Sequence, residues 1–386
     1  MKIALLAGEV SGDNYGALLA RHLLKLQPGL TLIGLGGQKM RQAGLRILQE
    51  MPPGRMGWSG VLLQLPGYYR LCRQTVSQLL AEKPDLIVFI DNPGFNLALA
   101  RAVGKNFPCY YYIPPKVWAH GKNRLKILRE YVRAVIPIFP FEPAYYQKEG
   151  ILCHWFGHPI IDLIDFQADT EDLEKKCLVG KNEAVVGILP GSRPQEIEYL
   201  MPEFLWLSRK ITVQSKVKII FSAVDQTVRK LESQHMNRVG VQFPIWEGPV
   251  YPLLKRASLL LATCGTANLE IALLDKPFLI FYRTSWFNYA VARAVVKLSA
   301  VSPVNIILGE TAVPEHLQFI HRKVVLEQTM ELLRKGNLYH RQLLSFQKLK
   351  KLLTGEAVTE KVARFLLSQS EASTRTGSLT HAERIC

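Results

Sequence analysis

The sequence predicts an α/β fold in which two Rossmann-like parallel-sheet domains face a cleft and are followed by C-terminal helices. Three observations lead to this prediction. Short apolar runs alternate with helical segments over residues 2–156, and a second alternation of the same kind begins at residue 184. The apolar runs are continuous, as in strands that are buried on both faces of a parallel sheet. From about residue 322 the periodicity is helical throughout.

The first half of the chain supplies the strands of the N-terminal domain. Residues 2–7 form the first expected strand, and Asp13 is expected to cap a helix over residues 14–26. Later strands are expected at 30–35, 85–90, 109–113, 135–139 and 151–156, with a helix at 95–103. Ligands of open parallel sheets bind beyond the carboxyl ends of the strands, so the loops after these strands should carry the chemistry.

The second half repeats this organisation after a polar, acidic linker at residues 162–181. Strands are expected at 184–189, 217–221, 259–262 and 277–281, with a helix at 194–210. The predicted domains are therefore residues 1–165 and 183–335. Residues 336–367 would form helices that pack back on the first domain, and residues 368–386 a polar tail that we expect to be disordered.

The composition favours a basic, reduced protein with anionic partners. Of 386 residues, 48 are Lys or Arg and 32 are Asp or Glu, which gives a formal net charge of +16. The six cysteines are scattered without a C-x-x-C pair, as expected in the cytosol. No apolar stretch approaches the length of a transmembrane helix and the N-terminus reads as a strand, so any membrane contact is expected to be peripheral.

One strand end in the second half has the features of a phosphate site. Residues 258–270 read as a buried strand, a tight turn at Gly265-Thr266 and a helix for which Thr266 is a good N-cap. The start of such a helix favours a phosphate, and Glu270, one turn further on, could accept hydrogen bonds from ribose hydroxyls. An ordinary strand–turn–helix remains the alternative.

A second strand end completes the predicted nucleotide diphosphate site. Gly191 allows close backbone approach, Ser192 precedes the helix, and Arg193 offers a planar fork of donors to a diphosphate. A helix start with a surface arginine is the alternative. The chain has no D-x-D motif for a divalent metal, so the leaving-group charge would fall to Arg193 and the helix dipole.

The first half has acidic loops instead. Asp91 follows the strand at 85–90, where a carboxylate can act as a general base, although capping of the next turn is the alternative. The loop after the first strand carries two acids that would repel a pyrophosphate, so a hydroxyl-rich sugar is its expected guest. Its candidate residues are Gly8, Glu9, Ser11, Gly12 and Asp13.

Two further segments bear on partners. A basic run over residues 116–133 reads as nucleic-acid contact or, more often, as a solvated or membrane-facing surface. Residues 56–71 are unusually apolar, and they could form core or a surface for acyl chains; the candidates are Trp58, Leu62, Leu63, Leu65, Tyr68 and Tyr69. No metal site is expected, because Gly157 and Pro159 break any helix that would align His154 with His158.

Taken in order, these segments resemble the lipid-A-disaccharide synthases, inverting glycosyltransferases of the two-domain GT-B architecture. The matching motifs are Gly8-Glu9-x-Ser11-Gly12-Asp13, Met56-Gly57, Asp91-x-Pro93-x-Phe95-Asn96, Val117-Trp118-Ala119, Phe139-Pro140-Phe141-Glu142, Gly157-His158-Pro159, Leu189-Pro190-Gly191-Ser192-Arg193-x-x-Glu196-Ile197, Gly265-Thr266-Ala267-x-Leu269-Glu270, Asn305 and Pro314-Glu315-x-Leu317-Gln318. Departures from the family pattern fall at Gly60, Pro114, Lys116, His120, Cys264 and Val304, mostly on the acceptor side.

The resemblance implies that UDP-2,3-diacylglucosamine donates its sugar to the 6-hydroxyl of 2,3-diacylglucosamine 1-phosphate, giving a β-1,6-linked disaccharide 1-phosphate and UDP. Asp91 would be the base of a single displacement, with no essential metal or other cofactor. The implied UDP-sugar ligands are Gly191, Ser192, Arg193, Gly265, Thr266, Glu270, Asn305, Glu315 and Gln318. The implied location is the cytoplasmic face of the inner membrane, as a peripheral protein; acyl length and formation of a homodimer are left open.

Two other functions are compatible with parts of the sequence. Another GT-B enzyme that acts on UDP-N-acetylglucosamine, such as a MurG-like transferase or a 2-epimerase, explains the nucleotide half but not the first-strand loop or the apolar segment. A basic nucleic-acid-binding protein explains the charge and little else, because two loops shaped for a diphosphate are not needed to grip a polymer. We therefore expect no nucleic-acid partner.

Overall fold

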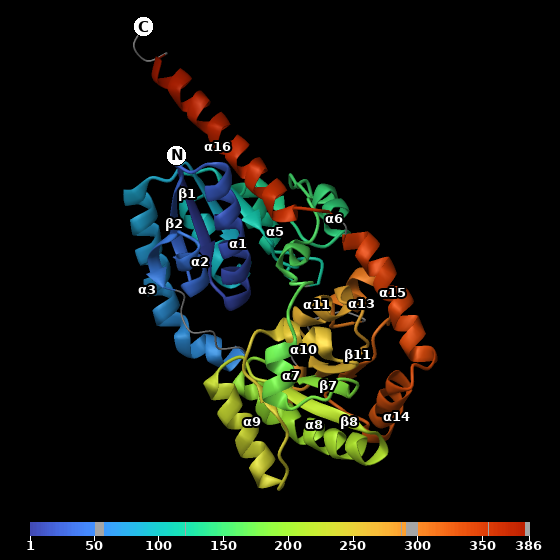
Figure 1. Cartoon of the computed structure of the whole chain (residues 1–386). Coiled ribbons are helices and arrows are strands. Elements are labelled where there is room, and N and C mark those ends of the chain that lie inside the picture. Colours follow the sequence, from blue (N-terminus) through green and yellow to red (C-terminus); the bar gives the residue numbers. More distant parts are fainter. Residues whose placement is uncertain (51–57, 120, 287, 291–299, 354, 383–386) are drawn as a thin grey trace. The chain divides into compact units, whose positions relative to one another are not determined.

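The computed structural model describes the chain except for residues 51–57, 120, 287, 291–299, 354 and 383–386; the side chains of residues 10, 58–66 and 371–382 are also outside the description. The chain divides into two compact units (Figure 1). Unit 1 comprises Met1–Leu163 and Leu353–Cys386, and unit 2 comprises Ile164–Leu352.

Unit 1 is built on a six-stranded parallel sheet with the strand order β3-β2-β1-β4-β5-β6. The strands are β1 (Lys2–Ala7), β2 (Thr31–Gly36), β3 (Arg46–Glu50), β4 (Leu86–Ile90), β5 (Cys109–Tyr112) and β6 (Ala134–Ile136). Residues 2–7 are thus the first strand, as predicted. The segment at 151–156 is not a strand: Cys153 forms only an isolated bridge with Val135. Trp155 and His154 there belong to an irregular segment that Gly157 and Pro159 bring to an end.

Helices cover both faces of this sheet and close its core. They are α1 (Val10–Leu26), α2 (Gln38–Gln42), α3 (Trp58–Glu82), α4 (Pro93–Val103), α5 (Arg124–Tyr131), α6 (Glu142–Lys148) and α16 (Val358–Ala382), with a 3₁₀ turn η1 (Pro159–Leu163). The five residues of β4 are all buried, as expected of a central parallel strand. Phe89 of β4 and Tyr111 of β5 lie in one apolar cluster with their ring centroids 5.7 Å apart.

Asp13 does not cap the helix for which it was predicted. The first helix already begins at Val10, so Asp13 lies inside it. The buried Asp13 carboxylate instead accepts hydrogen bonds from the backbone N–H groups of Gly37 (2.7 Å), Lys39 (3.1 Å) and Met40 (3.2 Å). The N–H groups at a helix start need acceptors, and Asp13 supplies them to α2 rather than to its own helix.

We expect Asp13→Ala to lower the free energy of unfolding of unit 1 by about 2 kcal/mol or more, because three backbone donors lose their acceptor. Urea unfolding followed by circular dichroism measures the change. Glu130→Ala is the control, since Glu130 is an exposed carboxylate of unit 1 at the end of α5. Equal stability of the two variants would contradict the capping role.

The last helix belongs to unit 1 although unit 2 precedes it in the chain. Figure 1 shows α16 beside α1, and the two helices pack together. Phe365 contacts Tyr110 at a ring-centroid distance of 5.8 Å, and the Thr359 backbone N–H donates to Asp162 at 2.6 Å. The tail expected to be disordered from residue 368 instead continues α16 to Ala382, since it contains no proline to end the helix.

Unit 2 has a second six-stranded parallel sheet, with the order β12-β11-β10-β7-β8-β9. The strands are β7 (Ala184–Leu189), β8 (Val217–Ser222), β9 (Ile245–Trp246), β10 (Leu259–Thr263), β11 (Phe278–Tyr282) and β12 (Glu315–Leu317). The order places β7 and β10 next to each other at the centre, with Leu189 in register with Ala262. Both predicted phosphate loops therefore leave neighbouring strands at the same edge.

The helices of unit 2 complete a second alternating layer structure. They are α7 (Glu171–Cys177), α8 (Pro194–Gln214), α9 (Gln226–Arg238), α10 (Val250–Arg256), α11 (Ala267–Leu273), α13 (Pro303–Leu308), α14 (Arg322–Leu333) and α15 (Asn337–Leu353). Leu200, Phe204 and Ile211 of α8 are buried in a cluster with strand residues such as Phe281. Within the described parts of the chain, no helix is both long and apolar enough to span a bilayer.

Candidate functional site

The Glu196 carboxylate fixes the loop after β7 by hydrogen bonds. Glu196, in the first turn of α8, accepts from the backbone N–H of Ser192 at 3.0 Å and from the Arg193 guanidinium at 3.0 Å. Gly191 has a φ of 126°, and a Cβ there would collide with the Glu196 side chain, so only glycine fits. Ser192 is exposed, and two fifths of the Arg193 side chain is accessible, which leaves a hydroxyl and a guanidinium facing solvent.

The turn after β10 is held by a residue that the sequence prediction missed. Thr266 stands at the cap position of α11, but its side chain makes no capping hydrogen bond. Asn268, which is fully buried, accepts from the Gly265 N–H at 3.0 Å and donates to the Thr263 carbonyl at 3.0 Å. The predicted cap position is confirmed, but Thr266 makes no capping hydrogen bond; Asn268, two positions on, bridges both sides of the turn instead.

These two loops lie side by side. Their strands pair in parallel, and the Thr263 hydroxyl donates to the carbonyl of Leu189 at 3.3 Å, immediately before the first loop. Gly265 and Thr266 are exposed, so hydroxyl and backbone groups accompany the guanidinium of Arg193 at one edge of the sheet. Guanidinium, hydroxyl and exposed backbone are the groups that bind a diphosphate.

The other residues predicted for the UDP-sugar have partners within the protein. Glu270 accepts from the Tyr251 hydroxyl at 2.7 Å. The buried Asn305 amide donates to the Val313 carbonyl and to Glu315, both at 2.8 Å, and accepts from the Val313 N–H at 3.0 Å. The structure thus uses the Asn305 amide to hold its own loop.

Glu315 and Gln318 also position backbone. Glu315 accepts from the N–H groups of Val301 and Ser302, each at 2.9 Å, and so fixes the start of α13. Gln318, whose φ is 55°, uses its amide to accept from the Thr284 N–H at 3.2 Å and to donate to the Thr284 carbonyl at 3.0 Å. These residues shape the same sheet edge from which the phosphate loops leave, rather than presenting free groups to it.

In unit 1, Asp91 lies at the carboxyl end of β4 in a strained loop. Asp91 and Asn92 have φ values of 52° and 41°, a left-handed conformation that is uncommon outside glycine and is best tolerated by Asp and Asn. Asn92, not Asp91, caps α4 by accepting from the Phe95 N–H at 3.4 Å, so the capping alternative for Asp91 was wrong. The Asp91 side chain is half-buried.

Neighbouring side chains fix the Asp91 loop. The Ser11 hydroxyl donates to the Asp91 carboxylate at 3.0 Å. The Asp91 carbonyl accepts from the Tyr111 hydroxyl and from the buried Asn96 amide, both at 2.8 Å. Burial, and secondarily the negative charge of Asp91, raises the pKa of Tyr111 well above its usual value, so this phenol stays a donor. Oriented in this way, the Asp91 carboxylate is a candidate general base.

Only some residues of the loop after β1 lie next to the Asp91 loop. Gly8 lies against Asn92, where a Cβ would overlap the asparagine side chain, and Ser11 reaches Asp91 directly. The buried Gly12 packs behind them against Ala7. Glu9 is exposed, whereas Asp13 faces α2. Of the five predicted loop residues, Asp13 is therefore structural, and Gly8 and Ser11 border the candidate base.

Two family motifs of unit 1 form a buried cluster. Glu142 accepts from the Trp118 indole at 2.9 Å and from the N–H groups of Phe139 (3.0 Å) and Ile138 (3.2 Å). Burial raises the pKa of Glu142, while burial followed by the nearby Lys116 charge lowers the pKa of His158 to about 3. These residues stabilise the loops after β5 and β6.

The apolar segment predicted to face acyl chains is described only in part. Trp58, Leu62, Leu63 and Leu65 belong to α3, but their side chains lie outside the described residues. Tyr68 packs edge-on against Phe95 at a ring-centroid distance of 5.9 Å, and burial, together with the Glu9 carboxylate, raises its pKa. Tyr69 is 74% exposed. The two tyrosines therefore differ: Tyr68 joins the core beside the Asp91 loop, and Tyr69 faces solvent.

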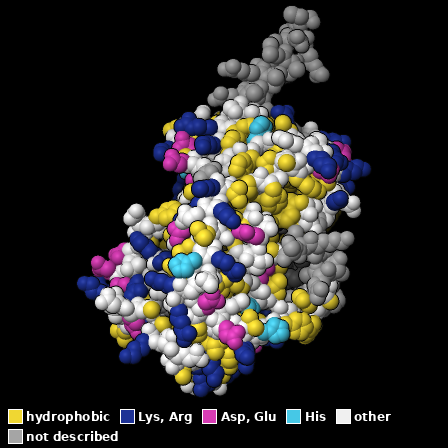
Figure 2. Space-filling view, turned by 90° about the vertical axis from the view of Figure 1, so that its right-hand side faces the viewer, with side chains coloured by type: hydrophobic (Ala, Val, Ile, Leu, Met, Phe, Trp, Pro, Cys, Tyr) yellow, Lys and Arg dark blue, Asp and Glu magenta, His cyan; other side chains and the backbone are white. Residues whose placement is uncertain are grey.

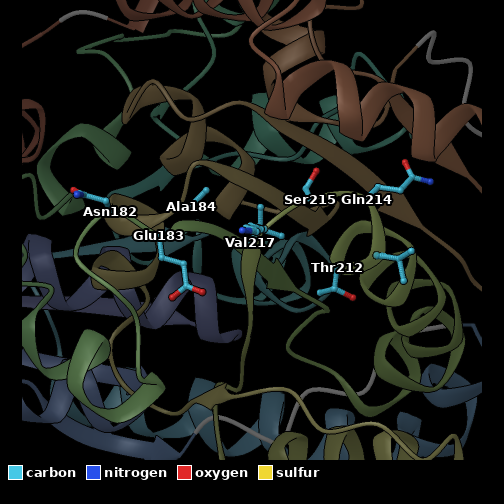
Figure 3. Close-up of a pocket in the computed structure, with 9 residues that line it drawn as sticks. Asn182, Glu183, Ala184, Thr212, Gln214, Ser215 and Val217 are labelled. Carbon is cyan, nitrogen blue, oxygen red and sulfur yellow. The ribbon is translucent and has the colours of Figure 1, made fainter.

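A separate pocket lies at the opposite edge of the unit 2 sheet. Its volume is about 760 Å³, and its lining includes Ala184 and Val217, the first residues of β7 and β8 (Figure 3). Ligands of parallel sheets bind at the carboxyl ends of strands, so this pocket is not the diphosphate site. Among the residues whose placement is described, no group of three or more His, Cys, Asp and Glu side chains could hold a metal ion.

Comparisons with known proteins agree with these features. A sequence model of the family described as Lipid-A-disaccharide synthetase matches residues 3–365. The chain is 34% identical over 323 residues to the lipid-A-disaccharide synthase of Neisseria meningitidis serogroup C, covering 82% of this chain and 84% of that protein. It is 30% identical over 391 residues to the lipid-A-disaccharide synthase of a Sulfurihydrogenibium species, covering 96% and 100%.

A solved structure supports the predicted architecture. UDP-GlcNAc 2-epimerase from Neisseria meningitidis, bound to UDP-GlcNAc, superposes with a TM-score of 0.64 at 14% identity, covering 95% of this chain and 100% of that chain. At this identity the similarity concerns the fold alone. It confirms the prediction of two Rossmann-like parallel sheets in a GT-B arrangement of the chain.

Proposed function

The chain belongs to the lipid-A-disaccharide synthase family of glycosyltransferases, and we propose that it joins two acylated glucosamine units. The donor is UDP-2,3-diacylglucosamine and the acceptor is 2,3-diacylglucosamine 1-phosphate. One observation supports this proposal most directly: the loops at Gly191–Arg193 and at Gly265-Thr266 leave adjacent parallel strands and expose a guanidinium and hydroxyls together.

In the proposed reaction, Asp91 takes the proton of the acceptor 6-hydroxyl. The acceptor oxygen then bonds to the anomeric carbon of the donor from the face opposite the diphosphate, while the bond from that carbon to the diphosphate oxygen breaks. UDP leaves with the electron pair, and the configuration at the anomeric carbon is inverted. The Ser11 hydroxyl at 3.0 Å and the two hydrogen bonds to the Asp91 carbonyl hold the base in place.

At the leaving group, Arg193 and the hydroxyls of Ser192 and Thr266 bind the departing diphosphate. Arg193 is aligned by Glu196, and the Gly265 turn is aligned by Asn268. Groups that are already oriented need no reorganisation as charge develops on the leaving oxygen. Asn305, Glu315 and Gln318 act one step further away, by fixing the backbone of this edge.

Mass spectrometry of the products of purified protein tests this function. With UDP-2,3-diacylglucosamine and 2,3-diacylglucosamine 1-phosphate, we expect a tetraacyl disaccharide phosphate and one UDP per disaccharide. Conversion of UDP-N-acetylglucosamine to its 2-epimer, without formation of any disaccharide, would favour the epimerase instead. UDP release without a disaccharide would exclude the proposed acceptor.

We further propose that the protein binds the surface of an anionic membrane peripherally. The net charge is +16, and Figure 2 shows Lys and Arg side chains spread over the visible face, with hydrophobic side chains gathered on unit 1. We expect binding to vesicles that contain anionic lipid and much weaker binding to neutral vesicles. Replacing Leu62, Leu63 and Leu65 of α3 by Ser should reduce the vesicle-bound fraction in co-sedimentation. Equal binding of wild type and this variant would remove the segment from the membrane contact.

A further inference from the structure

An aromatic cluster in unit 2 lies outside the diphosphate loops and the Asp91 loop. Trp286, Tyr289 and Phe319 meet edge to face, with ring-centroid distances of 5.2 Å for Trp286–Phe319, 6.1 Å for Trp286–Tyr289 and 6.4 Å for Tyr289–Phe319. Trp286 is 63% exposed and Phe319 is 56% exposed. Large aromatic rings that pack on one another yet remain this exposed are a binding surface rather than a core.

The cluster is assembled by two segments that are firmly tied together. Trp286 and Tyr289 follow β11, and Phe319 follows β12. Gln318, directly before Phe319, donates its backbone N–H to the Tyr282 carbonyl at 2.8 Å and bonds both backbone groups of Thr284 through its amide. The left-handed conformation of Gln318 is a strained turn that these hydrogen bonds stabilise. These hydrogen bonds therefore fix the backbone before Phe319 against the segment that leads to Trp286.

The cluster lies at the same sheet edge as the diphosphate loops. In the strand order β12-β11-β10-β7, the aromatic segments follow β11, which pairs with β10, and β12, which pairs with β11. With about 5 Å between neighbouring strands, they lie on the order of 5–10 Å along the edge from the Gly265 turn. The Cys264 thiol, at that turn, donates to the Val301 carbonyl at 3.4 Å. The backbone N–H of Val301 donates to the Glu315 carboxylate.

The charges around the cluster indicate what it binds. Arg283 and Arg322, on the segments that adjoin the rings, share the single carboxylate of Glu203, at 3.4 Å and 2.8 Å, and the exposed Lys323 follows Arg322. The Glu203 carboxylate offsets one of these positive charges and so weakens the attraction to an anionic lipid surface. An apolar group of a ligand that is bound at the diphosphate loops fits this surface better than an anionic membrane does.

We propose that Trp286, Tyr289 and Phe319 bind an acyl chain of the donor sugar. This inference rests on the proposed function, which places an acylated glucosamine on the diphosphate held by Arg193 and the Gly265 turn. The acyl chains branch from the sugar next to the diphosphate, so one of them reaches the rings across β11. Contact with the rings removes apolar surface of both partners from water.

The test compares acylated and non-acylated ligands. In the triple variant Trp286→Ser, Tyr289→Ser and Phe319→Ser, we expect the KM for UDP-2,3-diacylglucosamine to rise at least about tenfold. The Kd for UDP, measured by calorimetry, should stay within about twofold, because the diphosphate loops are unchanged. The matched control replaces three other exposed apolar side chains of unit 2 by Ser, namely Leu178, Val224 and Leu344, and should change neither quantity.

The outcomes separate the possibilities. An unchanged KM overturns the inference, and so does a parallel loss of UDP affinity, which would mean that the variant distorts the turn. Loss of vesicle binding with an unchanged KM would assign the rings to the membrane instead. If the wild type forms no disaccharide, the proposed function fails, yet direct calorimetric comparison of UDP-2,3-diacylglucosamine with UDP on both proteins still decides whether the rings bind acyl chains.

Discussion

Replacing Asp91 by Asn is expected to lower turnover at least about a hundredfold while leaving the affinity for UDP nearly unchanged. The substitution removes the negative charge of the Asp91 carboxylate and keeps the shape of the side chain. Asn tolerates the left-handed backbone that Asp91 adopts at φ 52°, and its side-chain oxygen can still accept the Ser11 hydroxyl. Disaccharide formation measured at saturating donor and acceptor, together with calorimetry of UDP, checks both parts of this prediction.

The control for the Asp91 variant is Glu130→Gln, which removes one exposed carboxylate of unit 1 at the end of α5. It should leave turnover within about twofold of the wild type, since a surface charge this exposed contributes little. Near-normal turnover of Asp91→Asn would show that another group removes the proton. A lower affinity for UDP in that variant would instead assign Asp91 to nucleotide binding.

Replacing Arg193 by Ala is expected to weaken UDP binding about tenfold or more. A charge-assisted hydrogen bond to a phosphate contributes about 1.5–3 kcal/mol, and 1.4 kcal/mol corresponds to a factor of ten in Kd. The loop itself should persist, because Glu196 still accepts from the Ser192 N–H at 3.0 Å. Isothermal calorimetry with UDP measures the effect, and the loss should shrink at high ionic strength only modestly, because one contact is involved.

Arg209→Ala is the control for Arg193. Arg209 is an exposed arginine of α8, the helix that follows Arg193, and it lies several turns after the start of that helix. It should bind UDP as the wild type does. Arg193→Lys should recover part of the lost affinity, since it restores the charge without the planar fork. Full affinity of Arg193→Ala would remove this residue from the diphosphate site.

The sequence predicted the long buried strands well because their signal is strong. Runs such as residues 2–7 and 184–189 coincide with β1 and β7, since continuous apolar residues fit only a strand covered on both faces. Three short edge or near-edge strands were not predicted: β3, β9 and β12. Edge strands of two to five residues have too short an apolar pattern to be distinguished from loops. Whether such a segment forms a strand depends on the neighbouring strand with which it pairs.

The family assignment made from the sequence is confirmed by the comparisons, and the loops predicted to carry the chemistry lie at the carboxyl edges of their sheets. Individual roles were harder to predict. Asp13 and Asn305 are polar and belong to family motifs; in the structure Asp13 accepts from backbone groups of its own unit, and Asn305 bonds the backbone of Val313 and the side chain of Glu315. A buried polar residue forms hydrogen bonds with the groups that the fold places next to it. The local sequence does not specify which groups these are.

The division of the chain also sets an order of synthesis. The ribosome completes residues 1–163, then makes all of unit 2, and only afterwards releases α16, the helix that packs on α1. At 5–20 residues per second, unit 2 delays that helix by roughly 10–40 s. During this interval α1 and the Tyr110 ring, to which Phe365 later docks, have no partner from α16. Unit 2 is thus the first part of this protein that can finish folding, although it is the second to begin.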